Sequence, residues 1–452
     1  MAVLGKTTLP VKKNLISFLL ITVIGSLFRC WWIIKIPNIP ESDFEGYYVI
    51  ATNFCNNLGI TMWGNPVAFQ GMGYPFVLGL FFKLAGNTEV LTGKYLNLLL
   101  SISTMVVLFF VFNKLFDKKI AMIAYFIVAL LPNYIAYNSV LGSEILFTFF
   151  IALTVLVQFS EFDNRYRYPL LGILIAFAAL TKPFFIAYPA IFAVAEWVRG
   201  KSVQQTVIAT LVVSLVMALV IAPWTYRNWR IFNVFVPISY NGGYVLYINN
   251  NDYNHYGGWM DPNNFEVSEE FKAKFVEKGT TFPEHPAQTD KLYRDEAKKW
   301  IFAHPIEFLE LGAIRVKNTF FSGSEDIVKW TMNLIDKDNL STQKLRKLFF
   351  FRAISDIIIY GLSSFGFFYT IINLKRIFVS LFRKTSTIGY KEAVITLNLA
   401  FLTAVFFVTE GQPRYNFPAL FFLVAATVAC MELIIKNSNG FFRSFPTEFS
   451  QR

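Results

Sequence analysis

Residues 89–112 have the sequence EVLTGKYLNLLLSISTMVVLFFVF, and no charged side chain follows Lys94 within this stretch. An α-helix rises about 1.5 Å per residue, so a stretch of about 20 apolar residues can cross the ~30 Å hydrocarbon layer of a bilayer. The stretch therefore predicts a transmembrane helix.

Similar apolar runs recur along the chain, although two of them are short. Hydrophobic residues make up 55% of the 452 residues and charged ones 16%, and the mean hydropathy is +0.46. A soluble domain has about 25% charged residues, so we expect an all-α polytopic membrane protein with about ten transmembrane helices. The predicted spans are 14–34, 89–112, 119–138, 143–160, 169–181, 184–198, 204–223, 349–373, 391–409 and 415–435.

The net charge of +11 is distributed unevenly. The two termini and the loops 113–119, 161–168, 199–203 and 374–391 would share one side of the bilayer. Together with the adjoining span ends they hold 18 basic and 7 acidic residues, a difference equal to the whole net charge. Because positive residues concentrate in cytoplasmic loops, we expect both termini inside and no nucleic-acid partner. This predicts a multi-pass membrane protein whose loops 36–88 and 224–348 lie on the extracytoplasmic side.

This topology divides the chain into three parts. Residues 1–223 form an N-terminal transmembrane module that includes a first outer loop, 36–88, in which 74–85 predicts a re-entrant or interfacial helix. Residues 224–348 form a small, mostly helical extracytoplasmic lobe with an amphipathic segment near 287–320. Residues 349–452 form the C-terminal transmembrane helices and a cytoplasmic tail.

Metal-binding residue types are scarce. The three cysteines lie far apart, and the three histidines include no pair spaced for a metal site. No metal ligand set or cofactor is identified, and a divalent metal stays an open question.

The first outer loop carries two candidate carboxylates in the sequence PESDFEGYY (40–48). Ser42 followed three residues later by Glu45 predicts a capping box, so Glu45 is either a capping partner or a substrate-binding acid. Asp43 lies in the first helical turn, where the helix dipole favours a carboxylate. At the membrane surface Asp43 can also act as a general base on an acceptor hydroxyl.

Outward-facing cations at span ends predict a phosphate site, because Lys and Arg bind phosphates. Their alternative role is to reach lipid head groups from the span ends. Glu144 and Glu410 are the outer acids, which either bind a metal or pair with these cations. The candidate substrate-binding residues are Glu45, Tyr74, Glu144, Lys182, Arg227, Glu410, Arg414 and Tyr415.

Several motifs occur in an order that resembles the GT-C glycosyltransferases. The resemblance is to the bacterial group similar to protein O-mannosyltransferases and aminoarabinose transferases (family 39). It runs through nearly the whole chain. The motifs are SDFEGYYVIATNF, GMGYPFVLGLFFKLAG, Pro132 followed by Ser143-Glu144, LTKP, APWTYRNWRIFNVFVPISYNGGYVLYINNN and GQPRYNFPAL.

The resemblance implies a protein of the bacterial cytoplasmic membrane with an extracytoplasmic active site and a polyprenyl-phosphate sugar donor. It also implies a catalytic acid in the first loop, at the position of Asp43. Family members often have two adjacent acids there, whereas the second acid of this chain is Glu45, two residues further on. The implied reaction is a single inverting transfer to a hydroxyl of a protein, glycan or lipid. Lys182, Arg227 and Arg414 would stabilise the departing phosphate.

Two other functions fit part of the same pattern. A transporter or flippase of a lipid-linked or anionic solute would also have about ten spans and helices interrupted by proline. A polymerase or ligase would move whole glycans from a lipid diphosphate. Transfer in detergent separates the enzymes from the transporter, because a transporter needs a sealed membrane.

Overall fold

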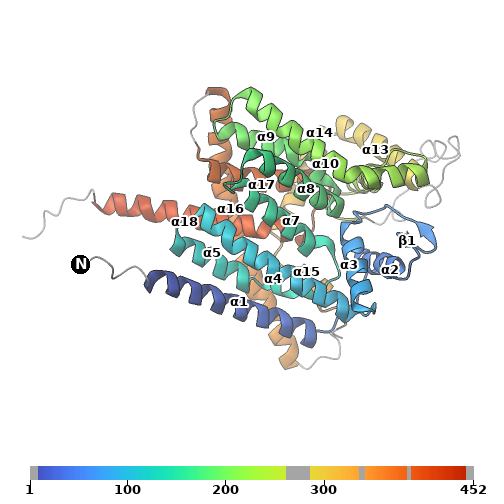
Figure 1. Cartoon of the computed structure of the whole chain (residues 1–452), viewed down its shortest axis with the longest axis horizontal. Helices are drawn as coiled ribbons and strands as arrows, with labels where there is room; N and C mark the ends of the chain where they lie inside the picture. Colours follow the sequence, from blue (N-terminus) through green and yellow to red (C-terminus); the bar gives the residue numbers. More distant parts are fainter. Residues whose placement is uncertain (1–8, 261–285, 335–341, 384–387, 444–452) are drawn as a thin grey trace, which may run out of the picture.

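The computed structural model of the chain describes residues 9–260, 286–334, 342–383 and 388–443. These residues form a bundle of helices with a single two-stranded hairpin (Figure 1). The elements of the first half are α1 (Leu9–Lys35), α2 (Asp43–Cys55), β1 (Thr61–Met62), β2 (Asn65–Pro66), α3 (Gly73–Ala85), α4 (Val90–Leu115), α5 (Lys118–Leu130), α6 (Pro132–Ala136), η1 (Tyr137–Ser139), α7 (Ser143–Gln158), α8 (Asn164–Thr181), η2 (Pro183–Ala187), α9 (Tyr188–Val198) and α10 (Val203–Phe232).

The second half is also helical where it is described. Its elements are α11 (Gly242–Asn249), α13 (Pro286–Ala303), α14 (Pro305–Phe320), α15 (Glu325–Thr331), α16 (Thr342–Arg383), α17 (Tyr390–Val408), η4 (Pro413–Ala419) and α18 (Leu420–Arg443). The parts of the predicted lobe at 261–285 and 335–341 lie outside the described residues.

All ten predicted apolar segments lie on helices, which confirms the all-α membrane fold. By length and composition, six helices among the described residues can cross a membrane, or seven if the bent pair of α5 with α6 and η1 counts as one span. Three further apolar helices, including α3, are shorter. A helix needs about 20 residues to cross the bilayer, and the six or seven long helices are the ones that meet this length.

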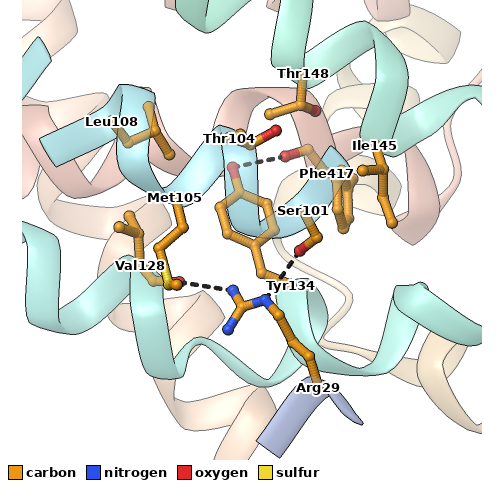
Figure 2. A pocket seen from close by; sticks show the side chains of 10 residues that line it. All are labelled: Arg29, Ser101, Thr104, Met105, Leu108, Val128, Tyr134, Ile145, Thr148 and Phe417. Atoms are coloured by element: carbon orange, nitrogen blue, oxygen red, sulfur yellow. Dashed lines mark hydrogen bonds between the residues drawn. The ribbon is translucent and has the colours of Figure 1, made fainter. Parts of the chain in front are cut away.

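The bend between α5 and α6 measures 50° and has a local chemical cause. Pro132 has no N–H with which to continue the α5 hydrogen-bond ladder onto the carbonyl of Val128. Arg29 of α1, which is only 1% exposed, lies against the end of α5 where the hydrogen-bond ladder stops. Its guanidinium donates to the carbonyls of Ala129 (2.6 Å) and Val128 (3.5 Å) and to the Ser101 hydroxyl (2.9 Å), and Figure 2 shows it beside the small cavity at this point.

The predicted lobe differs in two details from the expectation. The amphipathic segment near 287–320 is two helices, α13 and α14, which meet at His304 because Pro305 begins the second one. In addition, α10 continues to Phe232 and so crosses the predicted start of the lobe at 224. The division of the chain into three parts therefore stays a prediction.

Different elements lie at the two ends of the bundle (Figure 1). The first loop, with α2, the hairpin and α3, lies at the same end as α13. Residues of α2 and of the hairpin region pack with residues that follow α10 and with Ala287 in one apolar cluster. The start of α1 and the end of α18 lie at the opposite end.

Candidate active site

A cavity of about 460 Å³ lies where the start of α2, the start of α15 and the segment before η4 meet. Its wall combines acids, cations and aromatic rings. The lining residues are Ser42, Asp43, Tyr256, Gly258, Trp259, Glu325, Asp326, Lys329, Trp330, Gln412, Pro413 and Arg414. Aromatic faces beside carboxylates suit a sugar ring with several hydroxyls, and the cations suit a phosphate.

Asp43 begins α2 and holds two hydrogen bonds from opposite parts of the chain. Its Oδ1 accepts from Gln70 Nε2 at 2.8 Å, and its Oδ2 accepts from Arg414 Nη2 at 2.7 Å. Burial alone would raise the pKa of Asp43, but the charge and hydrogen bond of Arg414, the charge of Lys182 and the bond from Gln70 outweigh it. The pKa is therefore lowered, and the carboxylate, whose side chain is 37% exposed, stays ionised.

Arg414 is held in an aromatic cage at the start of η4. The guanidinium lies 5.4 Å from the ring centroid of Phe44, 5.6 Å from that of Trp330 and 5.0 Å from that of Tyr415. Such cation–π contacts fix a guanidinium in place when it is desolvated, and the Arg414 side chain is only 9% exposed. The cage thus holds the cation at the wall of the cavity, next to Asp43.

Glu410 and Tyr415 extend this network behind Arg414. Arg414 Nη2 donates to the Tyr415 hydroxyl at 3.2 Å, and that hydroxyl donates to Glu410 Oε2 at 2.8 Å. Gln412 also donates to Glu410. Burial raises the pKa of Glu410, although the charge of Arg414 acts against it. These residues orient Arg414.

Lys182 and Glu144 form a buried ion pair close to the same site. Lys182 Nζ lies 3.2 Å from Glu144 Oε1, and Glu144 is 3% exposed. Of the two roles that the sequence leaves open for Glu144, the structure shows the pairing with a cation. Lys182 acts on Asp43 through its charge and does not line the cavity.

Three of the predicted site residues lie elsewhere. Arg227 donates to the backbone carbonyls of residues 60 and 67, each at 3.0 Å, so it clamps the first loop instead of a phosphate. Tyr74 is fully buried and donates to Asn97 at 2.9 Å, which makes it part of the helix packing. Glu45 is exposed and does not line the cavity.

The predicted capping box at the start of α2 is wrong. Ser42 makes no side-chain capping bond, because its backbone has a positive φ of 54° that departs from the extended geometry of an N-cap. Glu45 therefore has no capping partner in Ser42. The buried face of α2 consists of Phe44, Tyr47, Ile50 and Ala51.

Asp326 is a cavity residue that the sequence analysis missed. It lies in the first turn of α15, is 4% exposed, and accepts a short hydrogen bond from the Tyr137 hydroxyl through Oδ2. Its Oδ1 has no hydrogen-bond partner. Burial raises the pKa of Asp326 to about 6, against the bond from Tyr137. The sequence around Asp326 contains no motif that would mark this single acid on a short helix as a site residue.

The residues that the structure describes contain no group of three or more His, Cys, Asp or Glu side chains that could hold a metal ion. Of the cavity acids, Asp43 pairs with Arg414, and Asp326 accepts a hydrogen bond from the Tyr137 hydroxyl.

Comparisons with known proteins agree with this architecture. Residues 70–226 match the family model of dolichyl-phosphate-mannose-protein mannosyltransferases. The archaeal oligosaccharyltransferase AglB from Archaeoglobus fulgidus, solved with an inhibitory peptide and a dolichol-phosphate, has a similar structure with a TM-score of 0.50 at 13% identity. The chain has the GT-C fold. The matching family and the matching structure are both glycosyltransferases by their descriptions, in line with the sequence resemblance.

The extent of these similarities is uneven. The match to AglB covers 96% of this chain and 52% of that one, so the chain spans about half the length of the solved structure. A second structure of the A. fulgidus enzyme, with Zn and sulfate, matches at 15% identity and a TM-score of 0.50, over 93% of this chain and 50% of that one. No curated protein matches the sequence. The family segment includes Glu144 and Lys182 but neither Asp43 nor Arg414.

Proposed function

We propose that the protein moves a sugar from a polyprenyl-phosphate donor to an acceptor hydroxyl, with inversion, and that Asp43 is the general base. The observation that carries the proposal is the pairing of an ionised Asp43 with Arg414 on the wall of a 460 Å³ cavity. A base must lie within hydrogen-bond reach of the proton that it takes, and Asp43 is exposed toward that cavity.

In the reaction, the acceptor hydroxyl gives its proton to a carboxylate oxygen of Asp43. The acceptor oxygen forms a bond to the anomeric carbon of the sugar on one face. The bond from that carbon to the phosphate oxygen breaks on the other face, and the electron pair leaves with the lipid phosphate. A phosphate is a stable leaving group, so the cavity has to supply cations for the developing charge and needs no general acid.

Arg414 links the two halves of this reaction. Its bond to Asp43 lowers the pKa of the carboxylate, which makes Asp43 a weak base as long as the pair is intact. A donor phosphate that accepts hydrogen bonds from the Arg414 guanidinium weakens the interaction of Arg414 with Asp43. The pKa of Asp43 then rises toward its ordinary value. Donor binding would thus strengthen the base at the moment when an acceptor can react.

The same geometry argues for placing the cavity on the extracytoplasmic face. Asp43 belongs to the first loop, at the end of the bundle opposite to the start of α1 and the end of α18 (Figure 1). The basic loops near the termini mark the cytoplasmic side by the positive-inside rule. The acceptor would then be a hydroxyl on an extracytoplasmic protein, glycan or lipid.

Substitution of Asp43 by asparagine tests the proposed base. Asp43→Asn keeps the shape and can still accept from Arg414, but it removes the basic oxygen, so we expect sugar transfer in detergent to fall by about 10²–10⁴-fold. The measurement is transfer from a polyprenyl-phosphate sugar to an acceptor by purified protein, with donor binding measured in parallel.

Glu45→Gln is the matched control, because Glu45 lies two residues away on the same helix and is exposed. We expect its transfer rate to stay within about twofold of the parent, as for an exposed surface substitution. Full activity of Asp43→Asn with loss of activity in Glu45→Gln would reverse the assignment. A parent protein that moves the lipid-linked solute only across sealed vesicles would favour the transporter.

A further inference from the structure

Three cations surround one buried carboxylate where α8, α9 and α17 meet. The carboxylate belongs to Glu196, near the end of α9, which is 1% exposed. It lies 3.6 Å from Arg167 Nη2 of α8 and 3.5 Å from Arg199 Nη1, and it also pairs with Lys201. Tyr390, the first residue of α17, donates a hydrogen bond to it at 3.1 Å. One negative charge therefore faces three positive ones.

Arg167 is the buried member of the three cations. Its side chain is 4% exposed, and its Nε has no hydrogen-bond partner among the described residues. Its bond to the neighbouring Tyr168 hydroxyl is long, at 3.4 Å. A guanidinium has five N–H donors, and a buried charge is destabilising unless it is paired and hydrogen-bonded. Arg167 can therefore donate to a further anion.

Aromatic rings hold the cations in place. The Arg199 guanidinium lies 4.9 Å from the ring centroid of Tyr390. Lys201 Nζ lies 4.8 Å and the Arg167 guanidinium 5.2 Å from that of Tyr168. The side chains of Arg199 and Lys201 are 36% and 17% exposed, so an anion can reach them from the surface. Because the cations are already ordered, binding an anion costs little side-chain entropy.

The start of α10 shows how deep in the membrane these cations lie. This helix begins at Val203, two residues after Lys201, and its last residue, Phe232, packs with residues of the first loop. A helix of 30 residues is about 45 Å long, so the cations lie at the end opposite to the candidate active site. Its first apolar side chains, each at least 49% exposed, are Val203, Val207, Ile208 and Leu211. The cations thus lie beside the surface that contacts lipid tails.

The neighbouring loop between α7 and α8 has the features of a membrane interface. Phe162 and Tyr166 are 57% and 62% exposed, and aromatic side chains are typical at the level of lipid head groups. The other ion pairs at this end are balanced one to one: Lys114 with Glu161 and Arg165 with Asp163. The excess of positive charge is therefore specific to the cluster around Glu196.

We propose that Arg167, Arg199 and Lys201 form a binding site for the phosphate head group of an anionic phospholipid. Basic pockets between transmembrane helices are suited to such head groups. A free phosphate has the same charge chemistry, but the lipid fits better because its acyl chains can lie on the exposed apolar side chains at the start of α10. The bound head group would link the ends of α8, α9 and α17 and stabilise the fold. The inference does not depend on the proposed function.

The test is binding of phospholipids to the full-length, delipidated protein in detergent, measured by native mass spectrometry and by the shift in Tm. We expect phosphatidylglycerol to raise the Tm and phosphatidylcholine, which has no net charge, to leave it unchanged. The double variant Arg199→Gln/Lys201→Gln keeps Arg167 and Tyr390 as partners of Glu196. Its affinity for phosphatidylglycerol should fall by about tenfold. Arg199→Gln alone, with a loss in the same direction, replaces it if the double variant does not fold.

The matched control is Lys114→Gln/Arg165→Gln. It removes the same two charges at the same end, from side chains that are 43% and 70% exposed, and should keep the affinity within about twofold because surface ion pairs contribute little. An equal loss in both double variants would show a general charge effect and overturn the site.

Two other outcomes contradict the proposal. Equal Tm shifts with phosphatidylglycerol and phosphatidylcholine would show that the cluster does not recognise an anion. Inorganic phosphate that raises the Tm as much as phosphatidylglycerol and displaces it would assign the cluster to a free anion and overturn the lipid. None of these measurements involves sugar transfer, so the site and the proposed function fail separately.

Discussion

Four buried or half-buried arginines of this protein differ in what their guanidinium groups contact. Arg29, Arg227 and Arg315 donate mainly to backbone carbonyls: at the end of α5, in the first loop and at the end of α17. Arg414 donates to the carboxylate of Asp43 and to a tyrosine hydroxyl. The carbonyl partners belong to the backbone of the fold, whereas a carboxylate partner can be exchanged for a phosphate. Among these four, Arg414 is the one that pairs with the proposed general base, Asp43.

Asp326 provides a prediction on pH dependence. Its pKa is about 6 in the folded protein, and an unfolded aspartate has a pKa of about 3.9. Because the folded value is raised, stability is highest below about pH 4 and is lost as the pH rises through 6. We expect Asp326→Asn, which cannot ionise but can still accept from Tyr137, to gain about 1–3 kcal/mol over the parent between pH 4 and pH 7.

Unfolding of both proteins in detergent at the two pH values measures this difference. Glu45→Gln provides the control, because its exposed side chain should give no such pH-dependent difference. A stability difference between Asp326→Asn and the parent that is the same at both pH values would show that Asp326 does not titrate in this window.

At the scale of elements, the break between α5 and α6 depends on Arg29. Removal of this side chain leaves the carbonyls of Val128 and Ala129 without their donors in the interior of a bundle, where backbone groups must be satisfied by protein. The gain from removing a buried charge offsets part of this loss. We expect Arg29→Met to lower the free energy of unfolding by on the order of 2 kcal/mol.

Thermal unfolding in detergent tests the role of Arg29. The control is Arg165→Gln, because the Arg165 side chain is 70% exposed and its ion pair with Asp163 should contribute under about 1 kcal/mol. Equal stability of Arg29→Met and the parent would mean that water replaces the guanidinium at the helix break.

The sequence predicted elements well where a single physical rule governs them. The thickness of the bilayer imposes the length of helices that cross it, so all ten apolar segments lie on helices, although those at 143–160 and 184–198 form helices shorter than a full span. The bend at Pro132 and the break at His304 were not predicted, although both sites contain proline. A periodic apolar pattern continues across such breaks, because the residues on either side are buried in the same core.

Prediction of the site was limited by tertiary contacts. Asp43 and Arg414 were both selected, but their pairing joins positions 371 residues apart and has no local signal. Arg227 was assigned to a phosphate because it is an outward-facing cation. The sequence does not distinguish a cation that binds a phosphate from one that clamps two carbonyls. The capping box failed because Ser42 has a positive φ, which a motif of two residue types does not encode.

At the scale of the whole molecule, the candidate active site and the predicted cytoplasmic side lie at opposite ends of the bundle. The candidate active site lies at the end that carries the first loop and α13, and the start of α1 and the end of α18 lie at the other end (Figure 1). The excess positive charge of the sequence falls in the segments that the predicted topology places on the side of the termini. Moving a basic loop across a membrane is unfavourable. This separation predicts which end faces outward, and the proposed reaction depends on that orientation.

Cysteine labelling in intact cells tests this orientation. In a background without Cys30, Cys55 and Cys430, we expect Asn65→Cys, in the exposed hairpin of the first loop, to react with a membrane-impermeant maleimide. Glu161→Cys, in the loop between α7 and α8, has a side chain that is 93% exposed and should react only after the membrane is permeabilised. Both positions are accessible to water, so a difference in labelling reports the side of the membrane and not burial. The reverse pattern would place the cavity in the cytoplasm, where the charge asymmetry would no longer follow the positive-inside rule, and would exclude an extracytoplasmic acceptor.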